Sequence, residues 1–137
     1  VGSHLAERAG GVVIRCVEPA GDSARHIREN LRGLSHTVHR ETVESFVKKN
    51  PQPRGESIVV LDPPRAGLSK AVRGWLLGAL PAQLFYMSCN PSTLARDLGE
   101  LVASYVVEEI IPFDFFPQTS HMEALALLRP KERDKGK

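Results

Sequence analysis

The chain has 137 residues, of which 42% are hydrophobic, and this is sufficient for one globular domain with a buried core. Its formal net charge of +2 is too small to indicate a dedicated nucleic-acid surface. No apolar stretch approaches the length of a membrane-spanning helix and no secretory leader is evident, which favours a cytoplasmic setting. Cys16 and Cys89 are the only cysteines, so neither a disulfide framework nor a zinc site is expected.

Predicted helices and strands alternate along the chain. Apolar residues at helical spacing, or short apolar runs, predict helices at residues 5–9, 23–31, 41–49, 68–80 and 93–104, and strands at residues 12–17, 37–40, 57–61, 84–88, 105–111 and 123–128. This alternation favours an α/β fold of Rossmann-like type, with a mostly parallel sheet covered by helices on both faces.

Local signals mark where these elements begin and end. Asp22 or Ser23 is the expected N-cap of the helix at residues 23–31, and Pro81 is expected to close the helix at residues 68–80. Residues 50–55 are turn-formers and make a linker too short to separate domains. Residues 130–137 are charged and are predicted to be disordered. Residues 1–4 are either an expression scar or the end of a glycine-rich loop.

Residues with reactive or ionisable side chains stand at the ends of three apolar runs. Asp62 and Cys89 each follow an apolar strand, and Glu123 opens the last one. Ligands of open α/β sheets bind at the carboxyl ends of the strands, so Asp62 and Cys89 are expected to share one crevice. Glu123 shares that crevice only if its strand runs antiparallel to the others.

Two of the candidates have a structural as well as a functional interpretation. A thiol at Cys89, on a strand-to-helix turn near a helix N-terminus, is placed to act as a thiolate, but free cysteines are often buried structural residues. Glu18 ends the predicted strand at residues 12–17, where an acid commonly binds ribose hydroxyls. An acid before Pro19 is equally a simple turn marker, and both interpretations stay open.

Three motifs resemble those of the RNA (uracil-5-)-methyltransferase family, class I S-adenosylmethionine-dependent enzymes that form 5-methyluridine. They are Leu61-Asp62-Pro63-Pro64-Arg65-Ala66-Gly67, Ser88-Cys89-Asn90-Pro91-Ser92-Thr93-Leu94-Ala95-Arg96-Asp97 and Phe116-Pro117-Gln118-Thr119-Ser120-His121-Met122-Glu123. The resemblance covers residues 5–129, as a partial methyltransferase domain that corresponds to the C-terminal part of the family's domain. It implies that the last strand is antiparallel.

The resemblance also implies a cofactor, a substrate and a role for each candidate residue. S-adenosylmethionine is the expected methyl donor, and a uridine of tRNA or rRNA the expected acceptor. Cys89 is the expected nucleophile at uracil C6, and Glu123 the base that removes the C5 proton. Glu18 and Asp62 are expected to contact the cofactor. The expected supports of the substrate or of the loops are Pro63, Arg65, Asn90, Pro91, Gln118 and His121.

Several parts of the family pattern lie outside this sequence. These are the first strand, the glycine-rich donor loop, the RNA-binding module and the upstream cysteine cluster. We therefore expect the chain alone to be inactive, to bind the donor weakly, and to associate with itself through exposed strand edges.

Two other functions remain open at this stage. Amino-methyltransferases acting on adenine or cytosine also carry an Asp-Pro-Pro loop, but they usually place an aromatic residue where Arg65 follows here, and they need no thiol. The other alternative is a folded fragment or binding module without turnover of its own.

Overall fold

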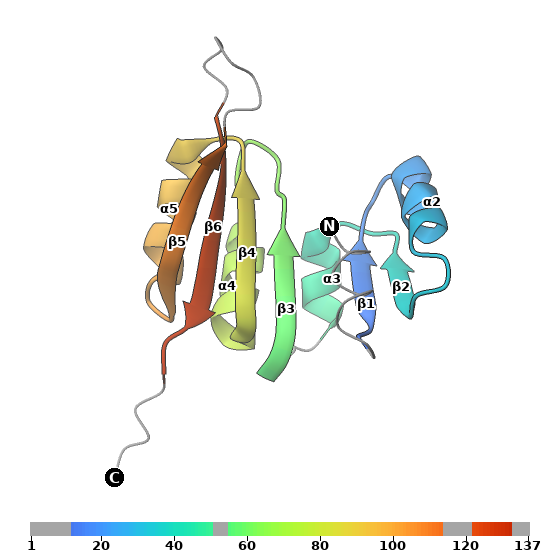
Figure 1. Cartoon of the computed structure of the whole chain (residues 1–137), viewed down its shortest axis with the longest axis horizontal. Coiled ribbons are helices and arrows are strands. Elements are labelled where there is room, and N and C mark those ends of the chain that lie inside the picture. The colour runs from blue at the N-terminus through green and yellow to red at the C-terminus, as the bar shows by residue number, and fades with distance from the viewer. Residues whose placement is uncertain (1–11, 51–54, 114–121, 133–137) are drawn as a thin grey trace. The chain divides into compact units, whose positions relative to one another are not determined.

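The computed structural model describes residues 12–50, 55–113 and 122–132 (Figure 1). The chain divides into two compact units, Val1–Asn50 and Pro51–Lys137, which meet at the segment expected to be only a short linker. The single partial domain at residues 5–129 stays a prediction. The helix at residues 5–9 and the expectation for residues 1–4 lie outside the described residues, as does most of the charged tail.

The described part of the first unit, residues 12–50, contains two parallel strands and two helices. Strand β1 (Ile14–Val17) pairs with β2 (His36–His39), and α2 (Gly21–Asn30) connects them, whereas α3 (Val43–Lys49) follows β2. Ala24 and Phe46 are buried, as predicted for inward helix positions. The predicted N-cap of α2 is wrong, because the helix begins earlier: Ala20 is the N-cap and no side chain caps the helix.

The second unit is a four-stranded sheet with the strand order β3-β4-β6-β5. Its strands are β3 (Gly55–Leu61), β4 (Pro81–Ser88), β5 (Tyr105–Phe113) and β6 (Glu123–Pro130), and its helices are α4 (Lys70–Ala79) and α5 (Pro91–Leu101). Strands β3 and β4 are parallel, whereas β6 is antiparallel to both β4 and β5. This confirms the predicted α/β fold with an antiparallel last strand.

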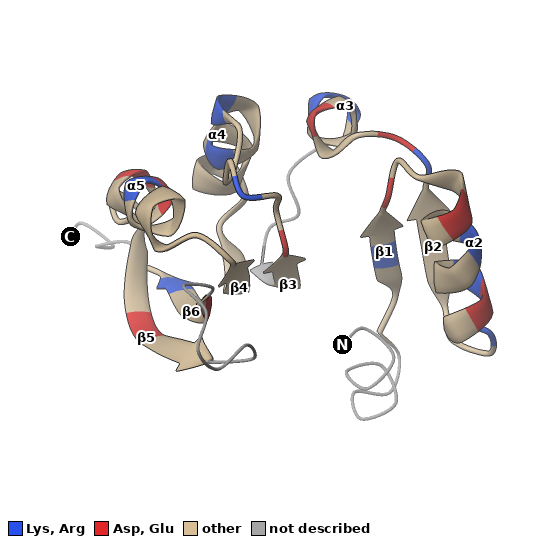
Figure 2. Cartoon of the chain, turned by 90° about the horizontal axis from the view of Figure 1, so that it is seen from above, with Lys and Arg blue, Asp and Glu red and all other residues tan. Residues whose placement is uncertain are grey.

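Helices α4 and α5 lie on the same face of this sheet (Figure 2). The alternating side chains of β4 and β6 that point to the helices are buried, and they are Leu84, Tyr86, Ser88, Ala124, Ala126 and Leu128. From β5 the Tyr105 hydroxyl donates a hydrogen bond to the Leu76 carbonyl of α4 at 2.7 Å. The core of the unit therefore lies between the sheet and these two helices. On the other face Ile58 and Val60 of β3 are 52% and 43% exposed.

The expected end of the helix before Pro81 is confirmed: α4 ends at Ala79, Leu80 is its C-cap with a left-handed backbone at φ 45°, and Pro81 begins β4. The apolar pattern of residues 93–104 also predicts that Val102 faces inward, and this is wrong, because Val102, the C-cap of α5, is 41% exposed.

Within the described residues, four strands have an edge without a strand partner. Strands β1 and β2 pair only with each other, β3 pairs only with β4, and β5 pairs only with β6. Self-association through them stays a prediction. None of the helices in the described ranges is long and apolar enough to cross a membrane.

The buried side of β4 gives a first test of the packing. Leu84 has no exposed surface, so we expect Leu84→Ala to lower the free energy of unfolding by about 3 kcal/mol, because it removes buried apolar surface and leaves a cavity. Urea unfolding of the chain measures the change. Val102→Ala at the exposed helix end is the control, with an expected change below about 0.5 kcal/mol. Equal effects of the two substitutions would contradict the packing described here.

Candidate active site

Three of the predicted residues lie at the same edge of the four-stranded sheet. Ser88, the last residue of β4, is paired with Ala124 of β6, so the residues one step beyond this pair are Cys89 and Glu123. Glu123 is also paired with Phe113 at the end of β5. Paired residues of antiparallel strands have Cα atoms about 5 Å apart, so Cys89 and Glu123 occupy adjacent positions on neighbouring strands.

Asp62 reaches the same edge from the parallel neighbour of β4. Leu61 pairs with Tyr86, and β3 ends there, so Asp62 is the first residue beyond the carboxyl end of β3. The Asp62 side chain is exposed, whereas Cys89 and Glu123 are partly exposed. Cys89 is therefore not a fully buried core residue. Cys16 has the same partial exposure and lies within β1, where burial raises the pKa of its thiol.

For three of the predicted residues, Glu18, Gln118 and His121, a position at this edge stays a prediction. Glu18 belongs to the first compact unit, where its carboxylate accepts a hydrogen bond from the Ala20 N–H at 2.8 Å. The turn interpretation of Glu18 is thus realised, and one carboxylate oxygen is left for another donor. Gln118 and His121 lie outside the described residues, so their roles stay predictions.

The turn that carries Cys89 is stabilised by its neighbours. The Ser88 hydroxyl lies 3.2 Å from the Asn90 backbone nitrogen and 3.1 Å from the Asn90 carbonyl oxygen. Asn90 is the N-cap of α5, and its side-chain oxygen accepts the Ser92 N–H at 3.1 Å. Pro91 occupies the first helical position, where a missing N–H costs nothing. Asn90 and Pro91 therefore start α5 directly after the turn, and their roles as supports of the substrate or the loops stay predictions.

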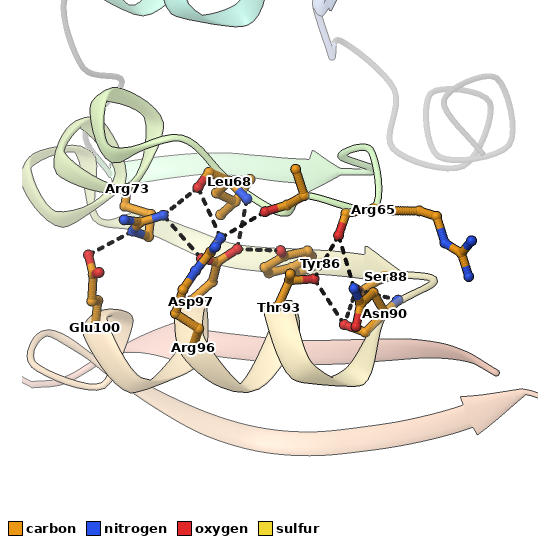
Figure 3. A network of polar contacts seen from close by, with 11 residues as sticks. Arg65, Leu68, Arg73, Tyr86, Ser88, Asn90, Thr93, Arg96, Asp97 and Glu100 are labelled. Carbon is orange, nitrogen blue, oxygen red and sulfur yellow. Dashed lines mark hydrogen bonds and ion pairs between the residues drawn. The ribbon is translucent and has the colours of Figure 1, made fainter. Parts of the chain in front are cut away.

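Side chains of α5 also hold the loop that follows β3 (Figure 3). The Asn90 side-chain nitrogen donates to the Arg65 carbonyl at 3.2 Å, and the Thr93 hydroxyl lies 3.1 Å from the same oxygen. Arg96 donates to the Ala66 carbonyl at 2.9 Å. In Figure 3 the exposed side chain of Arg65 extends away from α5, whereas its carbonyl oxygen lies against the helix.

Asp97 is the centre of these contacts. Its carboxylate has no exposed surface and accepts hydrogen bonds from the Leu68 N–H and the Tyr86 hydroxyl, both at 2.7 Å. The Arg96 and Arg73 guanidinium groups lie 2.7 Å and 3.1 Å from its other oxygen. Burial opposes ionisation of Asp97, but the hydrogen bonds and the Arg96 charge outweigh it, so the pKa of Asp97 is lowered. The carboxylate thus remains charged inside the unit.

A glycine allows the loop to come this close to Asp97. Gly67 has a left-handed backbone at φ +76°, and a Cβ atom added there would lie 2.5 Å from a carboxylate oxygen of Asp97. Its N–H donates to the Pro64 carbonyl at 2.8 Å, which closes a tight turn after the two prolines. A glycine is therefore required at this position of the loop.

Sequence reasoning did not single out Asp97, Arg73 or Tyr86. A signal for Asp97 was present, because it occupies the inward stripe of α5 together with Leu94, Leu98 and Leu101. A charged residue on an apolar helix face is rarely buried unless it is paired, and it therefore indicates a partner. Arg73 and Tyr86 are such partners, but nothing in their own sequence environments marks them.

Comparison with known proteins agrees with this architecture. The family model described as tRNA (Uracil-5-)-methyltransferase matches residues 54–131, which is more than half of the chain. The chain belongs to this family. The resemblance recognised from the three motifs is thereby confirmed.

Individual relatives show how much of the family's length is present. An uncharacterized RNA methyltransferase of Protochlamydia amoebophila is 40% identical over 125 residues, which are 87% of this chain but 29% of that protein. A Nitratidesulfovibrio vulgaris RNA methyltransferase, also uncharacterized, is 37% identical over 95% of this chain and 29% of its own length. The chain therefore spans less than a third of the length of these curated relatives.

Solved structures give the same fold. The crystal structure of the Pyrococcus abyssi tRNA (uracil-54, C5)-methyltransferase, a complex with S-adenosyl-L-homocysteine, is 30% identical, with a TM-score of 0.77 over 93% of this chain and 31% of that chain. A SAM-dependent methyltransferase from Leishmania major has a TM-score of 0.63 at 10% identity, and this similarity concerns the fold alone.

The close approach at Gly67 can be tested by a pair of substitutions in the same unit. Gly67→Ala is expected to destabilise the chain by about 2 kcal/mol or more, through left-handed strain and the clash with Asp97. Gly99→Ala, in the exposed part of α5 with no atom within 4 Å, is expected to stabilise it by about 0.5–1 kcal/mol. Urea unfolding measures both changes. A neutral Gly67→Ala would contradict the tight loop.

The lowered pKa of Asp97 predicts a pH-dependent effect of Asp97→Asn. Because the folded pKa lies below the unfolded value, the ionised carboxylate stabilises the fold above about pH 4, and this contribution is lost as pH falls through the folded pKa. Asp97→Asn should cost ~3 kcal/mol at pH 7, since it leaves the buried guanidinium contacts uncompensated. The cost should shrink at pH 3. An equal cost at both values in urea unfolding would contradict the charged state.

Proposed function

We propose that this chain is part of an S-adenosylmethionine-dependent RNA (uracil-5-)-methyltransferase that modifies C5 of a uridine in tRNA or rRNA. One structural observation supports this proposal in addition to family membership. The register of β4 and β6 places Cys89 and Glu123 one residue beyond the Ser88–Ala124 pair, on adjacent strands at one edge of the sheet. A nucleophile and a base at neighbouring positions are what C5 methylation of uracil requires.

The two residues would act in sequence on one pyrimidine ring. The Cys89 thiolate adds to C6, and the electrons of the C5=C6 bond move to C5 and the C4 carbonyl as an enolate. C5 then takes the methyl group that S-adenosylmethionine supplies. The Glu123 carboxylate removes the remaining C5 proton, the C5=C6 bond forms again, and the Cys89 thiolate leaves. The methyl transfer leaves S-adenosyl-L-homocysteine, and after the last step the protein differs from its starting state only by the proton on Glu123.

The available carboxylates fit a methyl donor that carries a ribose and a positive charge. Asp62 is exposed at the carboxyl edge of the sheet, where its charge would offset a sulfonium or accept a hydrogen bond from the donor. Glu18 would bind ribose hydroxyls through the carboxylate oxygen that Ala20 does not use. The relative bound to S-adenosyl-L-homocysteine supports this assignment of the cofactor.

The remaining residues would support the loops and the RNA. Pro63 would restrict the loop after Asp62, and the exposed Arg65 side chain would contact a phosphate. Because C6 is covered in a stacked helix, the target uridine must be unpaired or flipped out. RNA is thus the proposed partner, and the cytoplasm the proposed compartment. The parts of the protein beyond this chain would supply most of the RNA contacts.

Catalysis by an amino-methyltransferase is the weaker alternative. That chemistry would use the Asp62 loop with an aromatic residue after the prolines, whereas Arg65 stands there with its backbone bound to α5. It also gives no role to a partly exposed thiol beside Glu123. The assignment of Cys89 as a nucleophile separates the two functions experimentally.

The proposal predicts opposite effects of two substitutions in the full-length protein that contains this chain. With the methyl donor and substrate RNA, Glu123→Gln should slow product formation by about 10²-fold or more and accumulate a covalent protein–RNA adduct, because the C5 proton stays in place. Cys89→Ala should form neither product nor adduct. Denaturing gels with labelled RNA measure the adduct.

Wild-type protein with RNA that carries 5-fluorouracil at the target position is the positive control, since fluorine at C5 cannot leave as a proton. An adduct that survives in Cys89→Ala would assign the nucleophile elsewhere. Methyl transfer to an amino group by Cys89→Ala would establish the alternative function.

A further inference from the structure

The polar contacts between α5 and the loop after β3 extend over one helix face. Asn90, Thr93 and the Arg96–Asp97 pair are spaced three to four residues apart, so they line the same side of α5. Asn90 and Thr93 both contact the Arg65 carbonyl, Arg96 binds the Ala66 carbonyl, and Asp97 accepts the Leu68 N–H. The contacts run from Arg65 through Ala66 to Leu68 (Figure 3).

We propose that Arg96 and Asp97 form a positioning pair for methyl transfer, which fixes the loop carrying Asp62 relative to the turn carrying Cys89. This inference rests on the proposed function, and it assigns a role to residues that touch neither substrate nor donor. Arg96 binds one Asp97 oxygen through two of its nitrogens, at 2.9 Å and 2.7 Å, and at the same time binds the Ala66 carbonyl.

Few residues separate α5 from Cys89, and few separate the part of the loop that is bound to α5 from Asp62. On one side α5 begins two residues after Cys89, so a shift of the helix moves the thiol. On the other side the loop begins at Asp62 and is bound to α5 at Arg65, Ala66 and Leu68. Asp97 also accepts from Tyr86 of β4, the strand that delivers Cys89. The loop, the strand and the helix therefore share one buried carboxylate.

The expected effect is on the rate of the chemical step, because a misplacement of about 1 Å between reacting groups can cost 10²-fold. Arg96→Lys keeps the positive charge but removes the planar guanidinium group, which binds the Asp97 carboxylate and the Ala66 carbonyl at the same time. Arg96 is 47% exposed, so the substitution is compatible with folding. The matched control is Arg129→Lys, in the surface ion pair with Glu108 on β5 and β6, where the arginine is 45% exposed.

The experiment uses the full-length protein, labelled methyl donor and RNA with 5-fluorouracil at the target position. The final amount of trapped adduct counts competent sites, and the rate at which it forms reports the steps up to methyl transfer. Arg96→Lys should reduce the rate about 10-fold and leave the final amount within about 20% of wild type, whereas Arg129→Lys should change neither quantity.

A second variant extends the test. Thr93→Val has almost the same shape but loses the hydroxyl, which lies 3.1 Å from both the Arg65 and the Asn90 carbonyl oxygens, and it should slow adduct formation about 3-fold at full final amount. If it is the only variant that folds, its rate decides the proposal.

Two outcomes would overturn the positioning role. An unchanged rate with a smaller amount of adduct would show that Arg96 contributes to folding alone. An unchanged rate of adduct formation with an unchanged final amount of adduct would show that the Arg96 guanidinium group has no role in the reaction. Absence of adduct in the wild-type protein is a different result, because it would refute the Cys89 mechanism itself and the positioning role with it.

Discussion

A charged carboxylate without contact to water is the main constraint on the second compact unit. Removing the Asp97 charge from solvent costs several kcal/mol, and this cost is offset only when all of its donors are in place. Those donors come from the loop after β3, from α4, from β4 and from α5 itself. Folding of the unit therefore requires these segments to assemble together, and the candidate site lies where they end.

The sequence predicted the strands of this unit well because they are short apolar runs bounded by prolines and polar turns. Ser57–Leu61 and Leu84–Ser88 fall inside β3 and β4, and residues 123–128 fall inside β6. Periodicity cannot give the direction of a strand, and the antiparallel orientation of β6 came from the family resemblance. The adjacency of Cys89 and Glu123 required the register, which no local pattern encodes.

Other features depended on tertiary contacts. The burial of Asp97 is possible only because Leu68 and Tyr86, 29 and 11 residues away along the chain, donate to it. Ala20 has no side chain that marks a helix start, yet it is the N-cap of α2, while the Glu18 carboxylate binds its N–H. Leu80 adopts a left-handed conformation that its residue type disfavours, and the change from α4 to β4 at Pro81 imposes it.

The position of β6 explains how a residue at the start of a strand joins residues at the ends of others. Parallel strands have only their carboxyl ends at the edge that carries Asp62 and Cys89. A base contributed by another parallel strand would therefore have to be a residue that comes after the last residue of that strand. An antiparallel strand beside β4 brings its first residue there instead. Ala124 points to the helices and is buried, so its neighbour Glu123 belongs to the opposite face, together with Leu125 and Leu127. A shift of the β4–β6 register by one residue would turn the Glu123 carboxylate towards α5 and remove it from the thiol, which makes this strand pairing a condition for the chemistry as well as for the fold.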